Sequence, residues 1–267
     1  MGLASAIMSG TGTKPGAEGQ IRSGAEPAPA INDEACMQRR LLSAASVLLA
    51  FCAGIARAEP PLAELLANAA PTADRVVLTL AARAAECAGR QGPAGAVDRL
   101  AVIDYSRPSS EPRLWVFDLD RGRLLFEELV AHGRGTGERF AEHFSNIEGS
   151  HMSSLGLFRA TESYDGANGY SLRLQGLEPG FNDRAFDRAI VMHGAPYVSQ
   201  DLIRKQGRIG RSWGCPAVRS AVARRMIDTL KHGALVFAYY PDGQWLEESS
   251  YLRCGSTPAV AAVARAR

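Results

Sequence analysis

A cysteine between a glycine and a proline is the residue of this chain best suited to covalent chemistry. Cys215 lies in the segment GRSWGCP, residues 210–216, and an apolar run ending in His193 and Gly194 precedes it. A thiol needs a base to become a thiolate at neutral pH, and a nearby histidine is the usual one. The pair predicts a nucleophilic Cys215 with His193 as its base.

The segments around the two residues indicate what must position them. The apolar run within residues 188–193 predicts a buried strand with His193 at its exit. Gly214 and Pro216 place the cysteine on a loop, and residues 217–230 predict a helix directly after it. A helix N-terminus at the cysteine would lower the pKa of its thiol. Together these features indicate a cysteine acyl-transfer site.

Length and composition bound the fold and the partners. The chain has 267 residues, of which 46% are hydrophobic, and a net charge of +2. This is enough for one domain with a sizeable core. Because the charge is small and the body of the chain has no Lys/Arg run, we expect no nucleic-acid partner.

The N-terminal segments predict export. Residues 1–36 are rich in Gly, Ala, Ser and Pro, and we interpret them as a mis-called or disordered extension. Residues 37–58 resemble a signal peptide, with a basic start, an apolar run over 41–55 and a small-x-small end at Ala58. The run is shorter than the roughly 20 residues of a membrane span. We expect translation from Met37 and a periplasmic protein, with an uncleaved anchor as the alternative.

The cysteine count is consistent with export. Cleavage after Ala58 would leave three of the five cysteines, and an odd number in an oxidising compartment leaves one free thiol. A disulfide between Cys87 and Cys254 would leave Cys215 free and would tie an N-terminal helix to the C-terminal segment. The alternative is that all three thiols are unpaired.

The remaining patterns predict a mainly β fold. A helical lead-in is expected over residues 59–95, with one helix over 76–87 and with Gly89 and Gly92 as its stops. The catalytic domain would cover 96–255 and a flexible tail 256–267. Its expected elements are a hairpin over 113–130, strands at 100–105, 155–161, 170–174, 188–193 and 234–240, and long loops at 132–155 and 195–211.

Several sequence blocks, taken in order, resemble the YkuD-type L,D-transpeptidases, and most closely the murein L,D-transpeptidase catalytic domain family. The blocks are HGRG at 132–135, GSHMSSLG at 149–156, GYSLRL at 169–174 and GRSWGCP at 210–216. The resemblance implies a β-sandwich-like catalytic domain that acts on peptidoglycan stem peptides. Its cysteine attacks the carbonyl between a diamino acid at position three and D-Ala at position four. Transfer of the acyl group to an amine of another stem gives a 3→3 cross-link.

The resemblance also implies roles for particular residues. Cys215 would be the nucleophile and His193 the base, and the N–H groups of Gly214 and Cys215 would form an oxyanion hole. Ser212 would orient the loop, and Arg211 could hold a substrate carboxylate by paired hydrogen bonds. The remaining candidates for the substrate groove are His151, Ser153, Tyr170 and Trp213.

Some of these assignments have alternatives. His151 could orient His193 as a third catalytic member, or be a loop histidine with local hydrogen bonds. His132 could shape the cleft or be a turn residue. This chain also departs from the common motif, because Trp213 replaces a histidine, Pro216 follows the cysteine, and the separation between base and nucleophile is longer than usual.

Other functional classes make different predictions. A carboxypeptidase or peptidase would use water as the acceptor of the same acyl-enzyme, and a non-catalytic cell-wall-binding module would have an unreactive Cys215. We expect no metal and no cofactor, because the histidines lack the short spacings typical of metal sites. No sequence feature specifies an oligomeric state.

Overall fold

The computed structural model describes residues 60–91 and 97–254, which belong to one compact unit, Ala58–Arg267. The expected extension over 1–36, the signal peptide over 37–58 and the tail over 256–267 lie outside the described residues. Within the described ranges, no helix is both long enough and apolar enough to cross a membrane.

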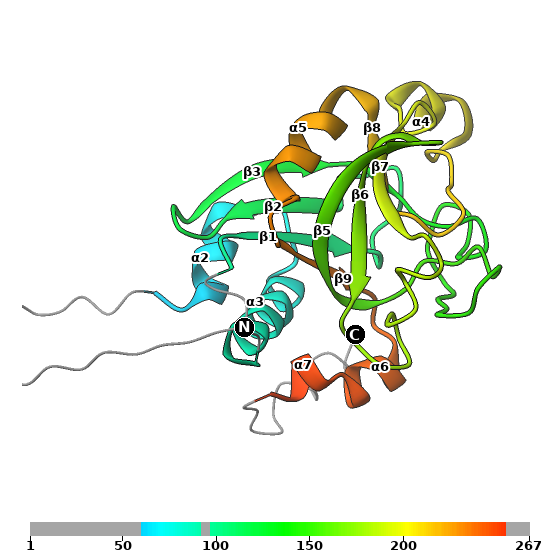
Figure 1. The fold of residues 1–267 in the computed structure, drawn as a ribbon. Coiled ribbons are helices and arrows are strands. Elements are labelled where there is room, and N and C mark those ends of the chain that lie inside the picture. The colour runs from blue at the N-terminus through cyan, green and yellow to red at the C-terminus, as the bar shows by residue number, and fades with distance from the viewer. Residues whose placement is uncertain (1–59, 92–96, 255–267) are drawn as a thin grey trace, which may run out of the picture. The chain divides into compact units, whose positions relative to one another are not determined.

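The described unit is built on a single nine-stranded sheet, with strand order β3-β2-β1-β9-β5-β6-β7-β8-β4 (Figure 1). Neighbouring strands are antiparallel except for the pairs β1/β9 and β7/β8, which are parallel. The mainly β class predicted from the sequence is therefore confirmed. The strands are β1 (Arg99–Asp104), β2 (Leu114–Asp118), β3 (Arg123–Glu128), β4 (Val130–Ala131), β5 (Gly156–Gly166), β6 (Gly169–Gly176), β7 (Val191–Ala195), β8 (Ala217–Arg219) and β9 (Leu235–Tyr239).

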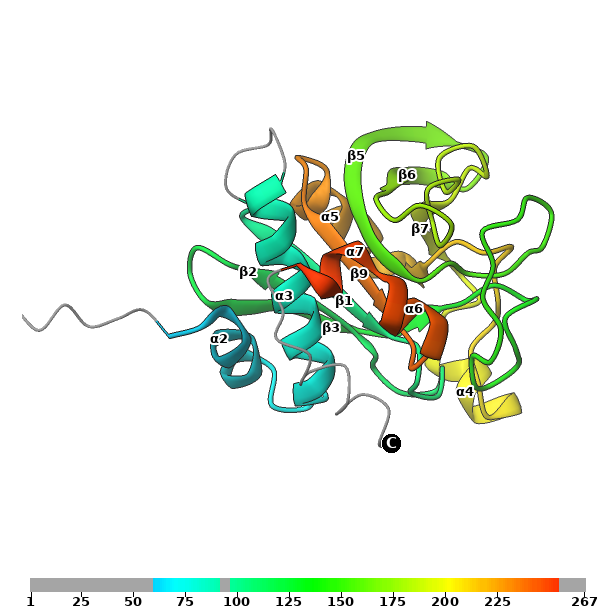
Figure 2. The same ribbon diagram turned by 90° about the horizontal axis from the view of Figure 1, so that it is seen from below.

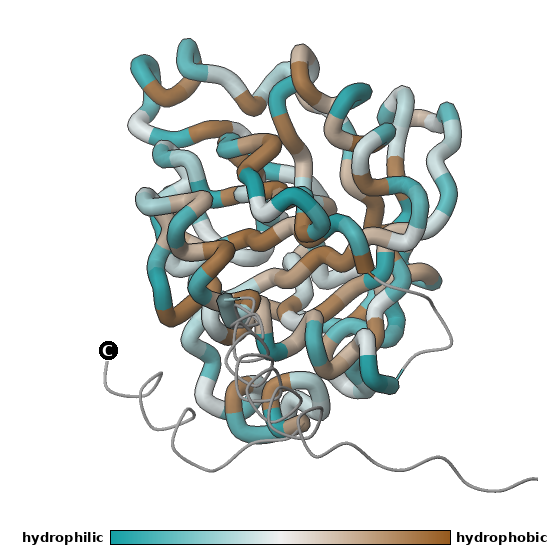
Figure 3. The backbone as a smooth tube through the Cα atoms, turned by 90° about the vertical axis from the view of Figure 1, so that its left-hand side faces the viewer, coloured by the Kyte–Doolittle hydropathy of each residue, from teal (hydrophilic) through white to brown (hydrophobic). Residues whose placement is uncertain are grey.

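The core follows from the continuous apolar runs of the central strands. Every residue of β2 and of β9 is buried, and these strands lie inside the sheet. Hydrophobic segments recur along the strands that cross the middle of the unit, while many outer turns are hydrophilic (Figure 3). A strand that is buried on both faces needs an apolar residue at nearly every position. The central strands thus provide the frame from which the loops of the site extend.

Two helices precede the sheet, α2 (Leu62–Ala69) and α3 (Arg75–Gln91). The predicted helical lead-in is therefore present in the structure. The face of α3 that includes Leu78, Ala81 and Ala85 is buried, and the helix packs on β1 and β9. The helix continues through Gly89, the first of the two predicted stops, and ends at Gln91, directly before Gly92, the second. A glycine inside a helix costs only about 1 kcal/mol, which the tertiary contacts of α3 can offset.

A disulfide joins α3 to the C-terminal end of the described chain. Cys87 and Cys254 are bonded, and Cys215 is the free cysteine of the described residues. Cys254 directly follows the short helix α7 (Ser250–Arg253), which lies beside α3 (Figure 2). The hypothesis that this pair leaves Cys215 free is confirmed. The nucleophile candidate is thus the only described thiol outside a disulfide.

Loss of this disulfide is expected to lower the free energy of unfolding. The cross-link joins residues 167 positions apart and restricts the unfolded chain. Replacing both Cys87 and Cys254 by alanine removes this restriction. For a loop of this length we expect a loss of about 2–5 kcal/mol. Chemical denaturation of the oxidised wild type and the double variant measures the difference. Equal stability would show that the cross-link does not constrain the unfolded state.

The segment after Cys215 differs from the prediction. Residues 217–219 form β8 before helix α5 (Ser220–Leu230) begins, so the helix does not start at the cysteine. Ala217 and Val218 pair with β7 on one side and β4 on the other, and both are fully buried. Pairing on two edges outweighs the helical propensity of a short apolar run.

The predicted loop over residues 195–211 contains a helix, α4 (Gln200–Gln206). The Ser199 side chain accepts a hydrogen bond from the N–H of Leu202, and Gly207 ends the helix in a left-handed conformation. These are ordinary helix start and stop signals. No residue of α4 is buried, so it lacks the apolar stripe by which helices are recognised in a sequence.

Helix α6 (Gly243–Glu248), which precedes α7, was also not predicted. It buries Trp245, whose indole N–H donates to the carboxylate of Glu178 at 3.0 Å. The same carboxylate accepts the N–H of Leu157 in β5 at 2.7 Å. Burial raises the pKa of Glu178. This carboxylate therefore links α6 to β5, the strand that follows the long loop 132–155.

Candidate active site

The nucleophile candidate lies on a short loop that Ser212 closes upon itself. The Ser212 hydroxyl donates to the carbonyl of Cys215 at 2.6 Å and accepts the N–H of Gly214 at 3.1 Å. Gly214 has a φ of +120°, and a β-carbon there would lie 2.8 Å from the carbonyl oxygen of Met152. Only glycine fits this conformation and this close approach.

The thiol of Cys215 is buried against the chain segment that leads into β7. The N–H of Val191 donates to Sγ at 3.4 Å, and the thiol donates to the carbonyl of Ala189 at 3.8 Å. Burial raises the pKa of the Cys215 thiol, while the Val191 N–H and the charge of Arg188 lower it in part. The expected contribution of a helix N-terminus was wrong, because α5 begins only at Ser220 and such effects fade within one turn. The thiol is therefore protonated at neutral pH and needs a base.

His193 has the protonation state of a base. It lies in the middle of β7, and not at the strand exit as predicted, because the strand continues to Ala195. Its Nδ1 lies 3.1 Å from the carbonyl of Gly194. A carbonyl only accepts hydrogen bonds, so Nδ1 carries the proton and Nε2 has the lone pair. Burial lowers the pKa of His193, which keeps the ring neutral at pH 7.

Strand register places the base and the nucleophile on adjoining segments of the chain. His193 pairs with Ala217 across the parallel strands β7 and β8, which sets Cys215 level with Val191. Residues two apart on a strand face the same side, so Val191 and His193 share a face. Among the described residues, Sγ bonds to backbone groups and not to the His193 ring. A turn of the cysteine side chain toward Nε2 would precede proton transfer, and such contacts are often long in unliganded enzymes.

Arg188 is a cation held beside the thiol. Its guanidinium donates to the carbonyl of Ser145 at 2.7 Å and of Met152 at 2.7 Å, and to the hydroxyls of Ser150 and Ser154. All four acceptors are neutral, so these bonds leave its positive charge uncompensated. The next residue, Ala189, has a φ of +53°, which is strained for a residue other than glycine. The segment thus brings one charge and two backbone groups to the thiol.

Replacing Arg188 by glutamine is expected to raise the pKa of the Cys215 thiol further. The variant loses the cation that lowers this pKa while burial continues to raise it. The pH profile of alkylation by iodoacetamide should shift to higher pH, and Arg188→Lys should shift it less. Arg184→Gln is the matched control, because it removes an exposed charge from the same segment. A profile that is unchanged in Arg188→Gln would contradict this electrostatic role.

Three loops interlock around the nucleophile. Ser212 exchanges backbone hydrogen bonds with His132 and Arg134, and the N–H of Gly135 donates to the carbonyl of His151. A β-carbon at Gly133 would lie 2.3 Å from that carbonyl oxygen. The loops around residues 132–135, 150–153 and 212–215 therefore form one backbone platform, and we refer to it as the three-loop platform.

Buried polar side chains support the three-loop platform from below. His132 is fully buried, with Nδ1 2.7 Å from the Arg113 guanidinium and Nε2 3.2 Å from the carbonyl of Gly137. Burial and the Arg113 charge lower the pKa of His132 to about 3, so the ring is neutral. Tyr105 packs edge-on to His132, and burial raises its pKa to about 12. His132 is therefore a buried neutral side chain that connects Arg113 to the loop at Gly137.

A family model described as the L,D-transpeptidase catalytic domain matches residues 69–239. The chain belongs to the L,D-transpeptidase catalytic domain family. The match includes His193, Cys215 and all three loops of the platform. No curated protein matches the sequence.

Several solved structures match part of this chain. An L,D-transpeptidase from Mycobacterium smegmatis is 14% identical over 54% of this chain and 59% of its own, with a TM-score of 0.34. The L,D-transpeptidase (Yku) from Stackebrandtia nassauensis is 13% identical over 67% of this chain and 76% of its own, with a TM-score of 0.33. The helical cell shape determining protein Pgp2 from Campylobacter jejuni is 12% identical over 63% of this chain and 53% of its own, with a TM-score of 0.36. The chain thus spans less than two thirds of the M. smegmatis enzyme.

Within this L,D-transpeptidase domain, three of the other predicted site residues lie on the three-loop platform and Tyr170 does not. Trp213 and His151 lie together on the platform, with ring centroids 5.1 Å apart, and Trp213 is 68% exposed. Ser153 is buried, and its hydroxyl accepts the N–H of Gly133 and donates to the carbonyl of Gly214. Ser153 therefore positions the nucleophile loop. Tyr170 lies away from this loop, because its hydroxyl donates to Asp228 of α5 at 2.7 Å.

The structure does not support the predicted roles of His151 as an orienting residue and of the Gly214 N–H as an oxyanion donor. The alternative that His151 orients His193 was wrong, because Nδ1 of His151 accepts from Arg134 and the Gly194 carbonyl orients the base. The Gly214 N–H is occupied by Ser212. In the part of the chain that the structure describes, the Cys215 N–H has no acceptor, and it is the remaining candidate donor to an oxyanion.

Sequence reasoning missed Arg188 and Arg134 as site residues, because neither stands next to the nucleophile or the base in the sequence. Their roles depend on how the loop 132–155 folds back onto the nucleophile loop. In residues 60–91 and 97–254, no three His, Cys, Asp or Glu side chains gather as a metal site would require.

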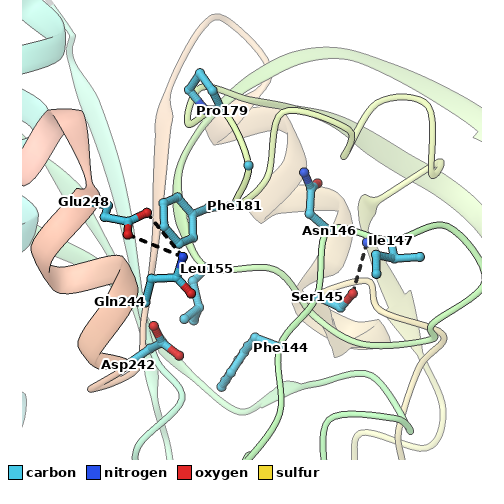
Figure 4. Close-up of a pocket in the computed structure, with 11 residues that line it drawn as sticks. Phe144, Ser145, Asn146, Ile147, Leu155, Pro179, Phe181, Asp242, Gln244 and Glu248 are labelled. Atoms are coloured by element: carbon cyan, nitrogen blue, oxygen red, sulfur yellow. Dashed lines mark hydrogen bonds between the residues drawn. The ribbon is translucent and has the colours of Figure 1, made fainter.

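A pocket of about 330 Å³ lies away from the nucleophile of this L,D-transpeptidase domain (Figure 4). It is formed by the start of the loop around Phe144, the turn at Pro179 and helix α6, where Gln244 bonds to Glu248. Its lining contains neither a cysteine nor a histidine. The covalent chemistry is therefore expected at Cys215 and not in this pocket.

Proposed function

We propose that this protein is an exported cysteine acyltransferase that forms 3→3 cross-links between peptidoglycan stem peptides. The observation that supports this most strongly is that a free, buried thiol and a neutral histidine with an unprotonated Nε2 lie on adjoining segments of an L,D-transpeptidase catalytic domain. Export through a signal peptide at 37–58, the lead-in at 59–95 and a catalytic domain at 96–255 are part of the same proposal.

The first half of the reaction forms an acyl-enzyme. Nε2 of His193 takes the thiol proton, and Sγ of Cys215 attacks the carbonyl between the diamino acid and D-Ala. The negative charge on the carbonyl oxygen is stabilised by the Cys215 N–H, since a fixed donor at a developing charge is worth several kcal/mol. His193 then returns the proton to the amine of D-Ala, which leaves. The donor tripeptide remains bound to Sγ as a thioester.

The second half transfers the acyl group. An amine of an acceptor stem gives a proton to His193 and attacks the thioester carbonyl, and the thiolate leaves and is protonated by the imidazolium. The products are a peptide cross-link and the free thiol, so the enzyme returns to its starting state. Water in place of the amine would give a free tripeptide, which is the carboxypeptidase alternative.

Product analysis distinguishes these reactions. The purified protein is incubated with disaccharide-tetrapeptides, and the products are separated by chromatography and identified by mass spectrometry. D-Ala release with 3→3 dimers is the expected result. D-Ala release with monomeric tripeptide alone would identify a carboxypeptidase. Binding to sacculi without any product would favour a non-catalytic cell-wall-binding module.

A further inference from the structure

We propose that Arg134, together with Trp213 and His151, binds a carboxylate of the donor stem peptide at the rim of the active site. The inference rests on the proposed function and assigns the recognition step to a residue other than the one that the motif suggests. Two carboxylates of a donor tetrapeptide fit this chemistry, the terminal one of D-Ala and the one on a diaminopimelate side chain.

The arginine that the motif suggests is already engaged in an ion pair. Nη1 of Arg211 lies 2.7 Å from a carboxylate oxygen of Glu138, and it also donates to the carbonyl of Gly137. Arg208 binds the other oxygen of the same carboxylate at 2.8 Å. These contacts occupy Nη1 of Arg211 and leave it less available for a paired contact with a substrate carboxylate. Arg211 is therefore a structural residue that fixes the loop 132–155 to the nucleophile loop.

Arg134 has the opposite character. Its side chain is exposed, and among residues 60–91 and 97–254 it forms no ion pair. Nε and Nη2 both donate to Nδ1 of His151, at 3.2 Å and 2.9 Å, while Nη1 makes neither bond. The guanidinium carbon lies 5.4 Å from the centre of the Trp213 ring. His151 and Trp213 thus hold the guanidinium in place, while no carboxylate of the described residues pairs with its charge.

The two rings add to this site. A guanidinium only donates, so Nδ1 of His151 accepts and Nε2 carries a proton that is available as a further donor. His151 has a φ of +54°, a strained conformation that the surrounding contacts must hold. Trp213 presents a large exposed ring to the same space. A planar carboxylate matches the fork of arginine, and the apolar part of a peptide can pack on the indole.

Rigid connections set this site close to the reacting sulfur. Trp213 stands two residues before Cys215, and the N–H of Arg134 donates to the carbonyl of Ser212 at 2.8 Å. Because the three-loop platform holds all three side chains, binding at Arg134 would fix the peptide relative to Sγ.

Steady-state kinetics of D-Ala release by the full chain test the assignment. The variants are Arg134→Gln and Arg134→Lys, and the matched control is Arg139→Gln, an exposed arginine on the same loop that covers Phe140. The donors are a diaminopimelate tetrapeptide, its C-terminal amide and its lysine counterpart. On the first donor, Arg134→Gln is expected to raise KM and lower kcat/KM by roughly 10- to 100-fold. Arg134→Lys should lose less, and Arg139→Gln should match the wild type.

The other two donors identify the carboxylate. If Arg134 binds the terminal carboxylate, the wild type and Arg134→Gln should have equal kcat/KM on the C-terminal amide. If it binds the side-chain carboxylate, the two proteins should have equal kcat/KM on the lysine peptide. Turnover by Arg134→Gln equal to the wild type, or an equal loss on all three donors, would overturn the inference.

Calorimetric binding in the Cys215→Ala background separates this inference from the proposed function. Suppose that the wild type releases no D-Ala, but that Arg134→Gln weakens binding of the tetrapeptide. That result would support the carboxylate site and overturn only the proposed reaction. Normal turnover together with affinity that does not depend on Arg134 would overturn only the carboxylate site.

Discussion

Replacement of Cys215 by alanine is expected to abolish D-Ala release and dimer formation while the fold is retained. Without Sγ no acyl-enzyme forms, and loss of a covalent nucleophile lowers kcat by at least about 10⁴-fold. The fold should persist because alanine keeps the β-carbon and Ser212 continues to bond to backbone groups of the loop. We expect a change in unfolding free energy within about 1 kcal/mol.

Chromatography of the products, together with thermal unfolding of both proteins, measures this effect. The double variant of Cys87 and Cys254 is the control for loss of cysteines outside the site, and it should keep its turnover at temperatures where it is folded. D-Ala release by a folded Cys215→Ala protein would contradict the proposed mechanism. Such a result would assign the reaction to a group other than the thiol.

Replacement of His193 by glutamine is expected to lower kcat/KM by roughly 10²- to 10⁴-fold, the range typical of a lost general base. The effect should be large here because burial raises the pKa of the thiol, so little thiolate exists without a base. Glutamine can still donate to the Gly194 carbonyl, so the loss would reflect proton transfer and not the packing of β7.

The pH profile adds a second criterion to the His193 variant. Burial places the pKa of His193 below its usual value of 6.5, and the ring acts as a base only when it is neutral. Wild-type kcat/KM should therefore stay level as the pH falls to 6.5 and decline only at lower pH. The acid limb should be missing in His193→Gln. His143→Gln, which alters an exposed histidine, should keep the wild-type profile, and a full acid limb in His193→Gln would assign it to another group.

The parts of the fold that sequence predicts well are those with strong local signals. The hairpin of β2 and β3 follows from two apolar runs around an Asp/Gly turn, and the helical spacing of apolar residues indicates α3. Cys215 and His193 follow from residue type and motif. Each of these inferences needs only residues that are close in the sequence.

The parts that sequence does not reveal depend on long-range pairing. Residues 217–219 resemble the first turn of a helix, and only pairing with both β4 and β7 makes them a strand. The choice between Arg211 and Arg134 as the free cation depends on Glu138, which the fold brings back onto the nucleophile loop. Arg188 is recognisable only when the loop around Met152 folds over it. Register and loop closure decide these features, and neither is visible in local patterns.

The central claim is that Sγ of Cys215 carries the donor tripeptide, and intact-mass spectrometry tests it most directly. The wild type and Cys215→Ala are mixed with tetrapeptide and quenched in acid within the first turnovers. The mass of each intact protein is measured, and peptide mapping then locates any adduct. We predict that the wild type gains the mass of the donor after loss of D-Ala, on the peptide that contains Cys215, and that the variant gains nothing. Turnover without this adduct, or an adduct on another residue, would contradict the mechanism.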